Sequence, residues 1–255
     1  VVIISYVWDP IATGWTITSS GWNTIHTFTS SWSFVVWFPL STLDWLISYH
    51  PMNGNGNDVI WAYPLTLNWA SLVTGNLWLP NTAYSTIGLS DWLKYWTTSI
   101  FNWANIGNTI MFWFNAYSWF NTWSRQWLYI LIGNAGEAVW ILIENWVTNA
   151  IDYYVGNLYK RISHSFTQDS WHQIAVTWDW TTAKFYHDGI LMDSWNSNNP
   201  NTMTWATANS YGSDTNNPRF QWYICQWMNF NRALSAGEIN LIYETSSTID
   251  ISTLL

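Results

Sequence analysis

Apolar residues alternate with polar ones along much of this chain, and a period of two predicts β-strands. The clearest runs are TIHTF (24–28), TIMFWF (109–114), WLYILI (127–132), VWILI (139–143), IDYYV (151–155), HQIAVTW (172–178) and AKFYH (183–187). Clusters of Asn, Ser, Gly and Asp, which are the usual turn formers, separate the runs. Many short strands joined by turns indicate an all-β sandwich or barrel.

One helix is predicted near the end of the chain, in LSAGEINLIYE (234–244). Ser235 is the expected N-cap, and Glu238 follows three residues later, as in a capping box. Leu234, Ile239 and Ile242 then form an apolar stripe that we expect to pack on the sheet.

The stretch MNGNGND (52–58) is the best candidate for a linker, because it is rich in Asn and Gly and contains no apolar residue except Met52. It separates a small β appendage (1–51) from a single domain (59–246), which is followed by a tail (247–255).

Charge restricts the partners. Lys and Arg number 7 against 15 Asp and Glu, so the formal net charge is −8. So few cations cannot neutralise a phosphate backbone or an anionic lipid surface well, which argues against nucleic acid. No apolar run approaches the roughly 18–20 residues that span a bilayer, so no membrane insertion is expected. Sugars and bound cations remain open as partners.

Cys225 is the single cysteine, so no internal disulfide forms, and its place in a strand predicts burial and not a nucleophile. The start, VVIISYVWDP, lacks an initiator Met and a basic region. We see no signal peptide there and expect a fragment of a larger parent chain with other domains.

Three segments together resemble the laminin-G-like, concanavalin A-like jelly-roll modules. They are DSWHQIAVTWDWTTAKFYHDGILMDS (169–194), RFQWYICQWMNFNRALSAGEINLIYE (219–244) and NTIMFWFN (108–115), with a weaker fourth in LTLNWASLVTGNLW (65–78). The resemblance implies an antiparallel jelly-roll sandwich with one short C-terminal helix, preceded by the small β appendage. Asp188-Gly189 is expected to form a type I′ turn and not a binding site. The fold hosts lectins, glycosidases and inert spacers, so it implies no particular activity.

Tryptophan is anomalous, with 25 residues beside 13 glycines. Trp113, Trp171 and Trp178 stand where the family carries an aromatic, but Trp69, Trp180 and Trp222 stand where it carries Gly. A further segment, SGWNTIHTFTSSWSF (20–34), resembles Gly-rich segments of phage tail and surface proteins, with Trp in place of Gly.

Two interpretations of the tryptophans follow. They are either aromatic platforms for sugars, or the product of translating as Trp an opal codon that the organism reads as Gly. We favour the second, because the tryptophans follow Asn, Asp, Ser and Gly at turns and do not keep to one strand face.

Catalysis is not predicted. A glycosidase on this fold needs two carboxylates that face each other, whereas Glu137 and Glu144 are seven residues apart and point to opposite faces of an unbroken strand. The five histidines show no metal-ligand spacing. We expect a structural role for His172 and a place at the turn for His187.

Binding residues are instead expected in the Asn-rich loops 193–217. Trp195, Trp205 and Tyr211 are candidates for stacking on sugar rings, with Asp214 and Asn217 as hydrogen-bonding partners. Related modules hold Ca²⁺ at the rim, and here Asp214, Asn216 and Asp91 offer the oxygen ligands that this cation prefers. Asp and Asn are also ordinary turn formers, so both roles stay open.

The sequence therefore predicts a non-catalytic module that recognises a glycan or a host or neighbouring cell surface. We expect it to belong to a large bacterial surface or phage structural protein, and so to be extracellular, at the cell surface or on a virion. The alternatives are a structural spacer without a ligand and, third, a glycoside hydrolase.

Overall fold

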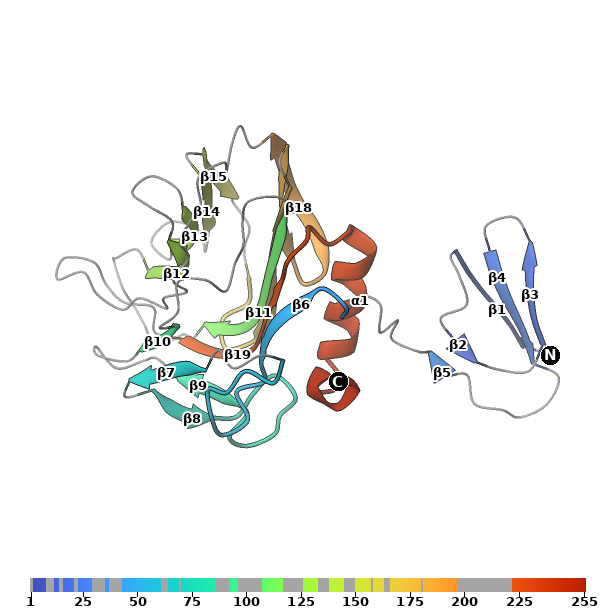
Figure 1. The fold of residues 1–255 in the computed structure, drawn as a ribbon, viewed down its shortest axis with the longest axis horizontal. Coiled ribbons are helices and arrows are strands. Elements are labelled where there is room, and N and C mark those ends of the chain that lie inside the picture. Colours follow the sequence, from blue (N-terminus) through green and yellow to red (C-terminus); the bar gives the residue numbers. More distant parts are fainter. Residues whose placement is uncertain are drawn as a thin grey trace. The chain divides into compact units, whose positions relative to one another are not determined.

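The computed structural model describes two compact units, Val1–Asp44 and Trp45–Leu255 (Figure 1). The described residues are 2–7, 12–13, 16–20, 23–28, 35–36, 43–60, 64–68, 70–85, 92–95, 107–116, 126–132, 138–144, 150–156, 158–162, 166–179, 181–196 and 222–255.

The described strands of the first unit form short antiparallel ladders. In its larger sheet β1 (Val2–Val7) pairs with β4 (Asn23–Phe28), which pairs with β3 (Thr16–Ser20). The two-residue strands β2 (Ala12–Thr13) and β5 (Val35–Val36) pair with each other.

The second unit begins earlier than the predicted linker. β6 (Leu46–His50), which the sequence analysis assigned to the appendage, pairs with β19 (Trp222–Phe230) of the large sheet. Tyr49 and Met52 are completely buried. The Asn/Gly-rich stretch after β6 thus forms a turn held against the core, where the Leu65 amide donates to the Gly56 carbonyl, 2.7 Å away. Turns and linkers share this composition, so the sequence could not separate them.

Among the described residues, the large sheet of the second unit has eight strands. Its order is β18 (Ile190–Asn196), β17 (Thr182–His187), β16 (Trp171–Trp178), β11 (Asn108–Ala116), β19, β9 (Ala83–Ser85) and β8 (Ser71–Val73), with β6 pairing off this path to β19. All pairings between its described strands are antiparallel.

Two smaller ladders complete the described strands. A meander contains β12 (Gln126–Ile132), β13 (Ala138–Glu144), β14 (Ala150–Gly156) and β15 (Leu158–Ile162). The strands β7 (Leu65–Asn68) and β10 (Trp92–Tyr95) pair with each other. The seven runs predicted from period two all fall on strands, and the antiparallel fold class is confirmed.

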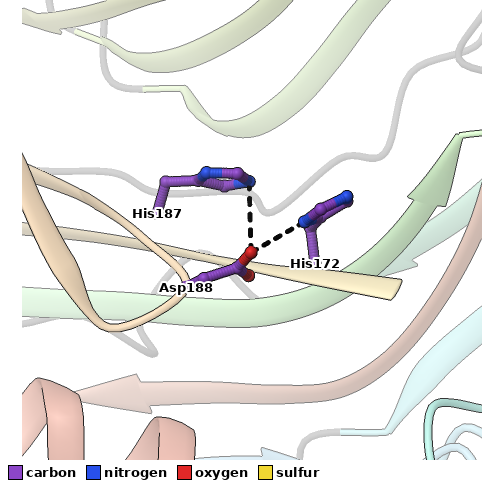
Figure 2. Close-up of side chains that lie close together, drawn as sticks. All are labelled: His172, His187 and Asp188. Atoms are coloured by element: carbon purple, nitrogen blue, oxygen red, sulfur yellow. Dashed lines mark hydrogen bonds and ion pairs between the residues drawn. The ribbon is translucent and has the colours of Figure 1, made fainter. Parts of the chain in front are cut away.

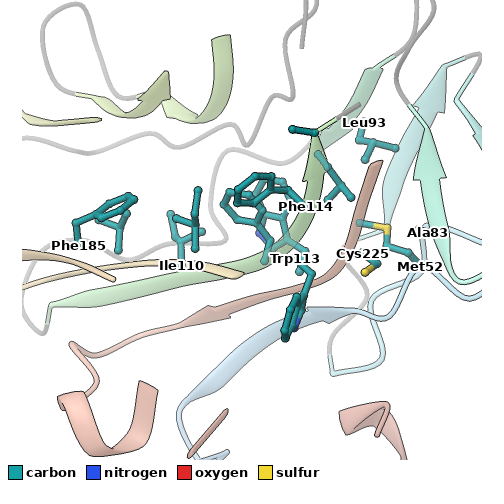
Figure 3. Packing of buried hydrophobic residues seen from close by; sticks show 14 of the residues in the cluster. Met52, Ala83, Leu93, Ile110, Trp113, Phe114, Phe185 and Cys225 are labelled. Carbon is teal, nitrogen blue, oxygen red and sulfur yellow. The ribbon is translucent and has the colours of Figure 1, made fainter. Parts of the chain in front are cut away.

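The core lies against β11, which is buried along its whole length. Ile110, Phe112 and Phe114 belong to one hydrophobic cluster with Val176 of β16 and Phe185 of β17. Figure 3 labels Ile110, Phe114 and Phe185 of this cluster. Residues 110–114 of β11 are apolar without interruption, as expected for a central strand covered on both faces, so this run does not keep the strict period of two by which it was predicted.

The helix α1 (Ala236–Ser246) covers the opposite face of β11. Its predicted capping box is present, since the Ser235 hydroxyl accepts from the Glu238 amide and the Glu238 carboxylate accepts from the Ser235 amide. Tyr243 stacks on Trp113 with ring centroids 5.5 Å apart. Leu234, Ile239 and Ile242 are buried, which confirms the predicted stripe. A short 3₁₀ helix, η2 (Ile251–Leu254), follows.

Two turns of the large sheet bear on the sequence predictions. Asp188 and Gly189 have φ values of 48° and 75°, and the positive φ at both positions matches the predicted type I′ turn between β17 and β18. Between β16 and β17, the Asp179 carboxylate accepts from the amides of Thr181 and Thr182, each at 2.7 Å. Trp180 of this turn lies outside the described residues. No helix among the described residues is long and apolar enough to cross a membrane.

Candidate functional site

The start of β16 carries two neighbouring side chains that point to opposite faces of the sheet. His172 faces the core, beside Phe114, and Trp171 faces the side on which α1 lies. Each is part of a separate cluster of polar and aromatic groups.

On the core face, His172, His187 and Asp188 converge (Figure 2). His172 Nδ1 lies 2.7 Å from Asp188 Oδ2, and His187 Nε2 lies 3.8 Å from the same oxygen. The two imidazole rings are 4.9 Å apart between centroids. The type I′ turn places Asp188 here, and its second oxygen accepts from the Gln173 amide at 2.7 Å.

His172 is held between two acceptors. Its Nε2 donates to the Thr167 carbonyl at 3.0 Å, and its Nδ1 faces the Asp188 carboxylate. Burial alone would lower the pKa of His172, but the hydrogen bond to Asp188 and its charge outweigh burial, so the pKa is raised. Burial would raise the pKa of Asp188, yet the two histidines and the Gln173 amide hold it below its ordinary value.

On the helix-side face, a row of residues runs across five strands. Trp171 of β16 lies opposite Asn115 of β11, which lies opposite Tyr223 of β19. The row continues through Ser85 of β9 to Ser71 of β8. Directly opposed residues in antiparallel strands point to the same face, so this line presents two aromatic rings, an amide and two hydroxyls.

The two rings of this row lean together across Asn115. Their centroids are 6.5 Å apart, although two strand spacings would place their backbones about 9.6 Å apart. The ring planes open at 41°, and both side chains are partly exposed. Asn115 lies between the two ring-bearing residues in the register, and its Oδ1 is buried and has no hydrogen-bond partner among the described residues. An unsatisfied buried carbonyl costs roughly 1–3 kcal/mol, which a ligand that donates to it would recover.

Most of the binding residues predicted from the sequence lie outside the described residues. These are Trp205, Tyr211, Asp214, Asn216, Asn217 and Asp91. Trp195 is described, on β18, where it is 8% exposed and belongs to the hydrophobic core cluster. Its indole therefore has a packing role in the structure and does not present an open face at a rim.

Cys225 is completely buried, as predicted. Its thiol donates to Asn76 Oδ1 at 3.2 Å, and burial raises its pKa far above the ordinary value, which leaves no thiolate to act as a nucleophile.

The sequence pattern did not predict the Trp171–Asn115–Tyr223 row or the clustering of His172 with His187 and Asp188. Asn115 and Tyr223 are 108 residues apart in sequence, and only strand register brings them together. The Asp188-Gly189 hairpin did carry a signal for the second cluster, since a two-residue turn fixes which positions of β16 and β17 share a face.

Comparison with known proteins agrees with this architecture. Residues 88–240, more than half of the chain, match the family described as the concanavalin A-like lectin/glucanases superfamily. No curated protein matches the chain.

Among solved structures, the binding domain of botulinum neurotoxin serotype D is similar, with a TM-score of 0.63, 16% identity and 81% of this chain covered. A second, the serotype D ligand binding domain in complex with N-acetylneuraminic acid, has a TM-score of 0.60, 17% identity and 80% of this chain covered. The chain spans 52% of the length of each, so the likeness concerns about half of those domains. The match to the family profile, together with the antiparallel sheets and the capped helix, establishes that the chain belongs to the concanavalin A-like lectin/glucanases superfamily.

Proposed function

We propose that the chain is a non-catalytic module that binds a neutral glycan. The observation that carries the proposal is the row Trp171–Asn115–Tyr223, with its two inclined, partly exposed rings and a buried amide oxygen that has no hydrogen-bond partner in the part of the chain that the structure describes. Sugar rings present C–H faces that stack on aromatics, and their hydroxyls donate to amide oxygens. The serines at the far end of the row, Ser85 and Ser71, offer further hydroxyl partners.

A neutral sugar suits the charges better than an acidic one. The row itself contains no Lys or Arg, and the whole chain has a net charge of −8. Arg232 is already paired with Glu238 at the start of α1. The similar neurotoxin domain is in complex with N-acetylneuraminic acid, an acidic sugar, whereas the row of this chain contains no cation to pair with such a carboxylate.

For the parent protein, its location and its partner, our proposal is the same as the prediction from the sequence. We propose a module of a larger bacterial surface or phage structural protein, placed outside the cell or on the virion, with a glycan or cell surface as partner. Calcium bound by Asp91, Asp214 and Asn216, which lie outside the described residues, is a separate part of the proposal.

The first experiment is a glycan array with the full chain, in calcium and in EGTA. Signal on neutral glycans that exceeds signal on sialylated ones supports the proposal, and loss of signal in EGTA would add the calcium site. A flat array in both conditions would favour the structural spacer, and hydrolysis of a polysaccharide would favour the glycoside hydrolase.

The variants are chosen so that a loss of glycan binding can be distinguished from a loss of the folded structure. Asn115→Leu removes the unsatisfied amide, so we expect unchanged or increased thermal stability together with loss of glycan binding. Tyr223→Ala should weaken binding about tenfold through lost stacking, whereas Tyr223→Phe keeps the ring and most of the affinity.

Trp45→Ala is the matched control. Trp45 is 43% exposed and precedes β6, which pairs with the other end of β19 from Tyr223. Binding that survives Asn115→Leu and Tyr223→Ala as well as it survives the control would exclude this row as the site.

A further inference from the structure

We propose that His172, His187 and Asp188 form a binding site for a divalent transition-metal ion of the zinc type. Their ligand atoms lie within 4.8 Å of one another, on the core face of the large sheet and separate from the aromatic row (Figure 2). The proposal does not depend on glycan binding.

The hydrogen bonds around the cluster engage the outward-facing atoms of His172 and Asp188, so the atoms that face each other are available to bind a metal ion. His172 uses Nε2 to donate to the Thr167 carbonyl, so Nδ1 is the nitrogen that faces inward. Asp188 uses one oxygen to accept from the Gln173 amide, so the other oxygen faces His172 Nδ1. A nitrogen lone pair and a carboxylate oxygen 2.7 Å apart need a cation between them, either a proton or a metal ion.

The position of His187, the third potential ligand, favours a metal ion over a proton between these atoms. His187 Nε2 lies 3.8 Å from the same Asp188 oxygen and comes from the end of β17, on the same face of the sheet as His172. In tetrahedral zinc sites, with bonds of about 2.0–2.1 Å, ligand atoms are about 3.3 Å apart. The observed 2.7 and 3.8 Å lie on either side of that value, so small side-chain rotations suffice.

The surroundings also fit such a site. The Thr167 carbonyl and the Gln173 amide are outer partners of the kind that orient metal ligands. Two imidazoles with one carboxylate suit Zn²⁺, Co²⁺ or Ni²⁺, whereas Ca²⁺ and Mg²⁺ prefer oxygen alone. The Asp188 side chain is 26% exposed, so an ion can enter from solvent and keep a water as its fourth ligand.

The test uses Co²⁺ as the probe, because tetrahedral Co²⁺ absorbs visible light and Zn²⁺ then displaces it. After chelator treatment and dialysis, the full chain should bind one Co²⁺ with a tetrahedral spectrum, and Zn²⁺, but not Ca²⁺ or Mg²⁺, should remove the colour.

Two variants remove ligands without removing the fold. Asp188→Asn keeps a residue that tolerates the φ of 48° and an oxygen for the Gln173 amide, and His187→Phe keeps an aromatic ring at a buried position. Each should weaken Co²⁺ binding about 100-fold or more.

His26→Ala, on β4 of the first unit, is the control and should bind normally. Folding of every variant is checked by circular dichroism. A folded wild-type chain without a saturable Co²⁺ spectrum, or binding that persists in both ligand variants, overturns the site.

Discussion

At the scale of single residues, the tryptophans are not equivalent. Trp113 Nε1 donates to Ser246 Oγ at 2.9 Å, and Trp227 Nε1 donates to Asn229 Oδ1 at 3.1 Å. Both indoles are almost completely buried. A glycine at either position would leave a large cavity and remove a hydrogen bond. The fold therefore fits tryptophan, and not glycine, at positions 113 and 227.

Trp78 shows the opposite behaviour. The Trp78 amide donates to the Gly75 carbonyl, and the Gly75 amide donates to the Leu79 carbonyl, at 3.0 and 3.2 Å. This is a three-residue hairpin loop whose last residue takes the left-handed conformation, a position that Gly normally fills. Trp78 has φ 59° and its side chain is 79% exposed, so the ring has little burial to offset the strained backbone.

We therefore expect Trp78→Gly to raise the free energy of unfolding by about 1 kcal/mol, since the left-handed conformation costs a bulky residue about 1–2 kcal/mol. Urea unfolding checks the value. Trp45→Gly is the control, because Trp45 has no positive φ, and it should lower stability instead. The recoding hypothesis has its own readout, because peptide mass spectrometry of the native protein should find Gly at position 78.

At the scale of elements, the end of the chain is held by a small number of polar contacts. Arg232 forms an ion pair with Glu238, and Glu238 also closes the capping box with Ser235. The hydrogen bond from Arg232 is the main cause that lowers the pKa of Glu238 to about 2, against the partial opposition of burial. The sequence predicted the box from spacing alone, but Arg232 was not part of that prediction.

The lowered pKa of the Glu238 carboxyl group determines how its contribution to stability changes with pH. The ionised Glu238 stabilises the folded state fully above its unfolded pKa of 4.5, and this contribution is lost as pH falls toward about 2. Glu238→Gln should therefore be less stable than wild type at pH 7, and the gap should close between pH 4.5 and 2. Thermal melts of both proteins across this range measure the gap, and a gap independent of pH would contradict the assignment.

Strand β19 contains a bulge with a buried polar residue, which the alternation of apolar and polar residues does not predict. Its register with β11 shifts between Met111 and Trp113, and Gln226 at this bulge has φ 46° although it is buried. Gln226 Nε2 donates to the Ser246 carbonyl and to Asn76 Oδ1, and its Oε1 lies 3.2 Å from the oxygen of the Tyr49 hydroxyl. These partners come from three segments that are distant in sequence. Only the folded chain therefore explains why a polar residue is buried at position 226.

At the scale of the molecule, β6 belongs to the second unit. Tyr49 is completely buried, and its hydroxyl donates to Asp250 Oδ1 at 2.7 Å, which links β6 to the end of the chain. Met52 is buried in the core cluster as well. Each such side chain contributes about 1.5–3 kcal/mol, against a typical total stability of about 5–15 kcal/mol.

Two truncations test this boundary. A chain of residues 45–255 should fold with a cooperative thermal transition. A chain of residues 59–255, cut at the predicted domain boundary, should lose that transition because it lacks β6 and Met52. Equal cooperativity of the two would show that β6 is dispensable.

The sequence by itself determined the strands with clear alternation, the capped helix, the Asp188-Gly189 turn and the class of fold. These features depend on contacts within a few residues, or on a period that one segment displays alone. The tertiary structure alone decided that residues 46–52 are core, that Trp195 packs inside, and that Trp171, Asn115 and Tyr223 form one row. These depend on which strands become neighbours and in what register, and pairing across a hundred residues leaves no mark on the local pattern of either strand.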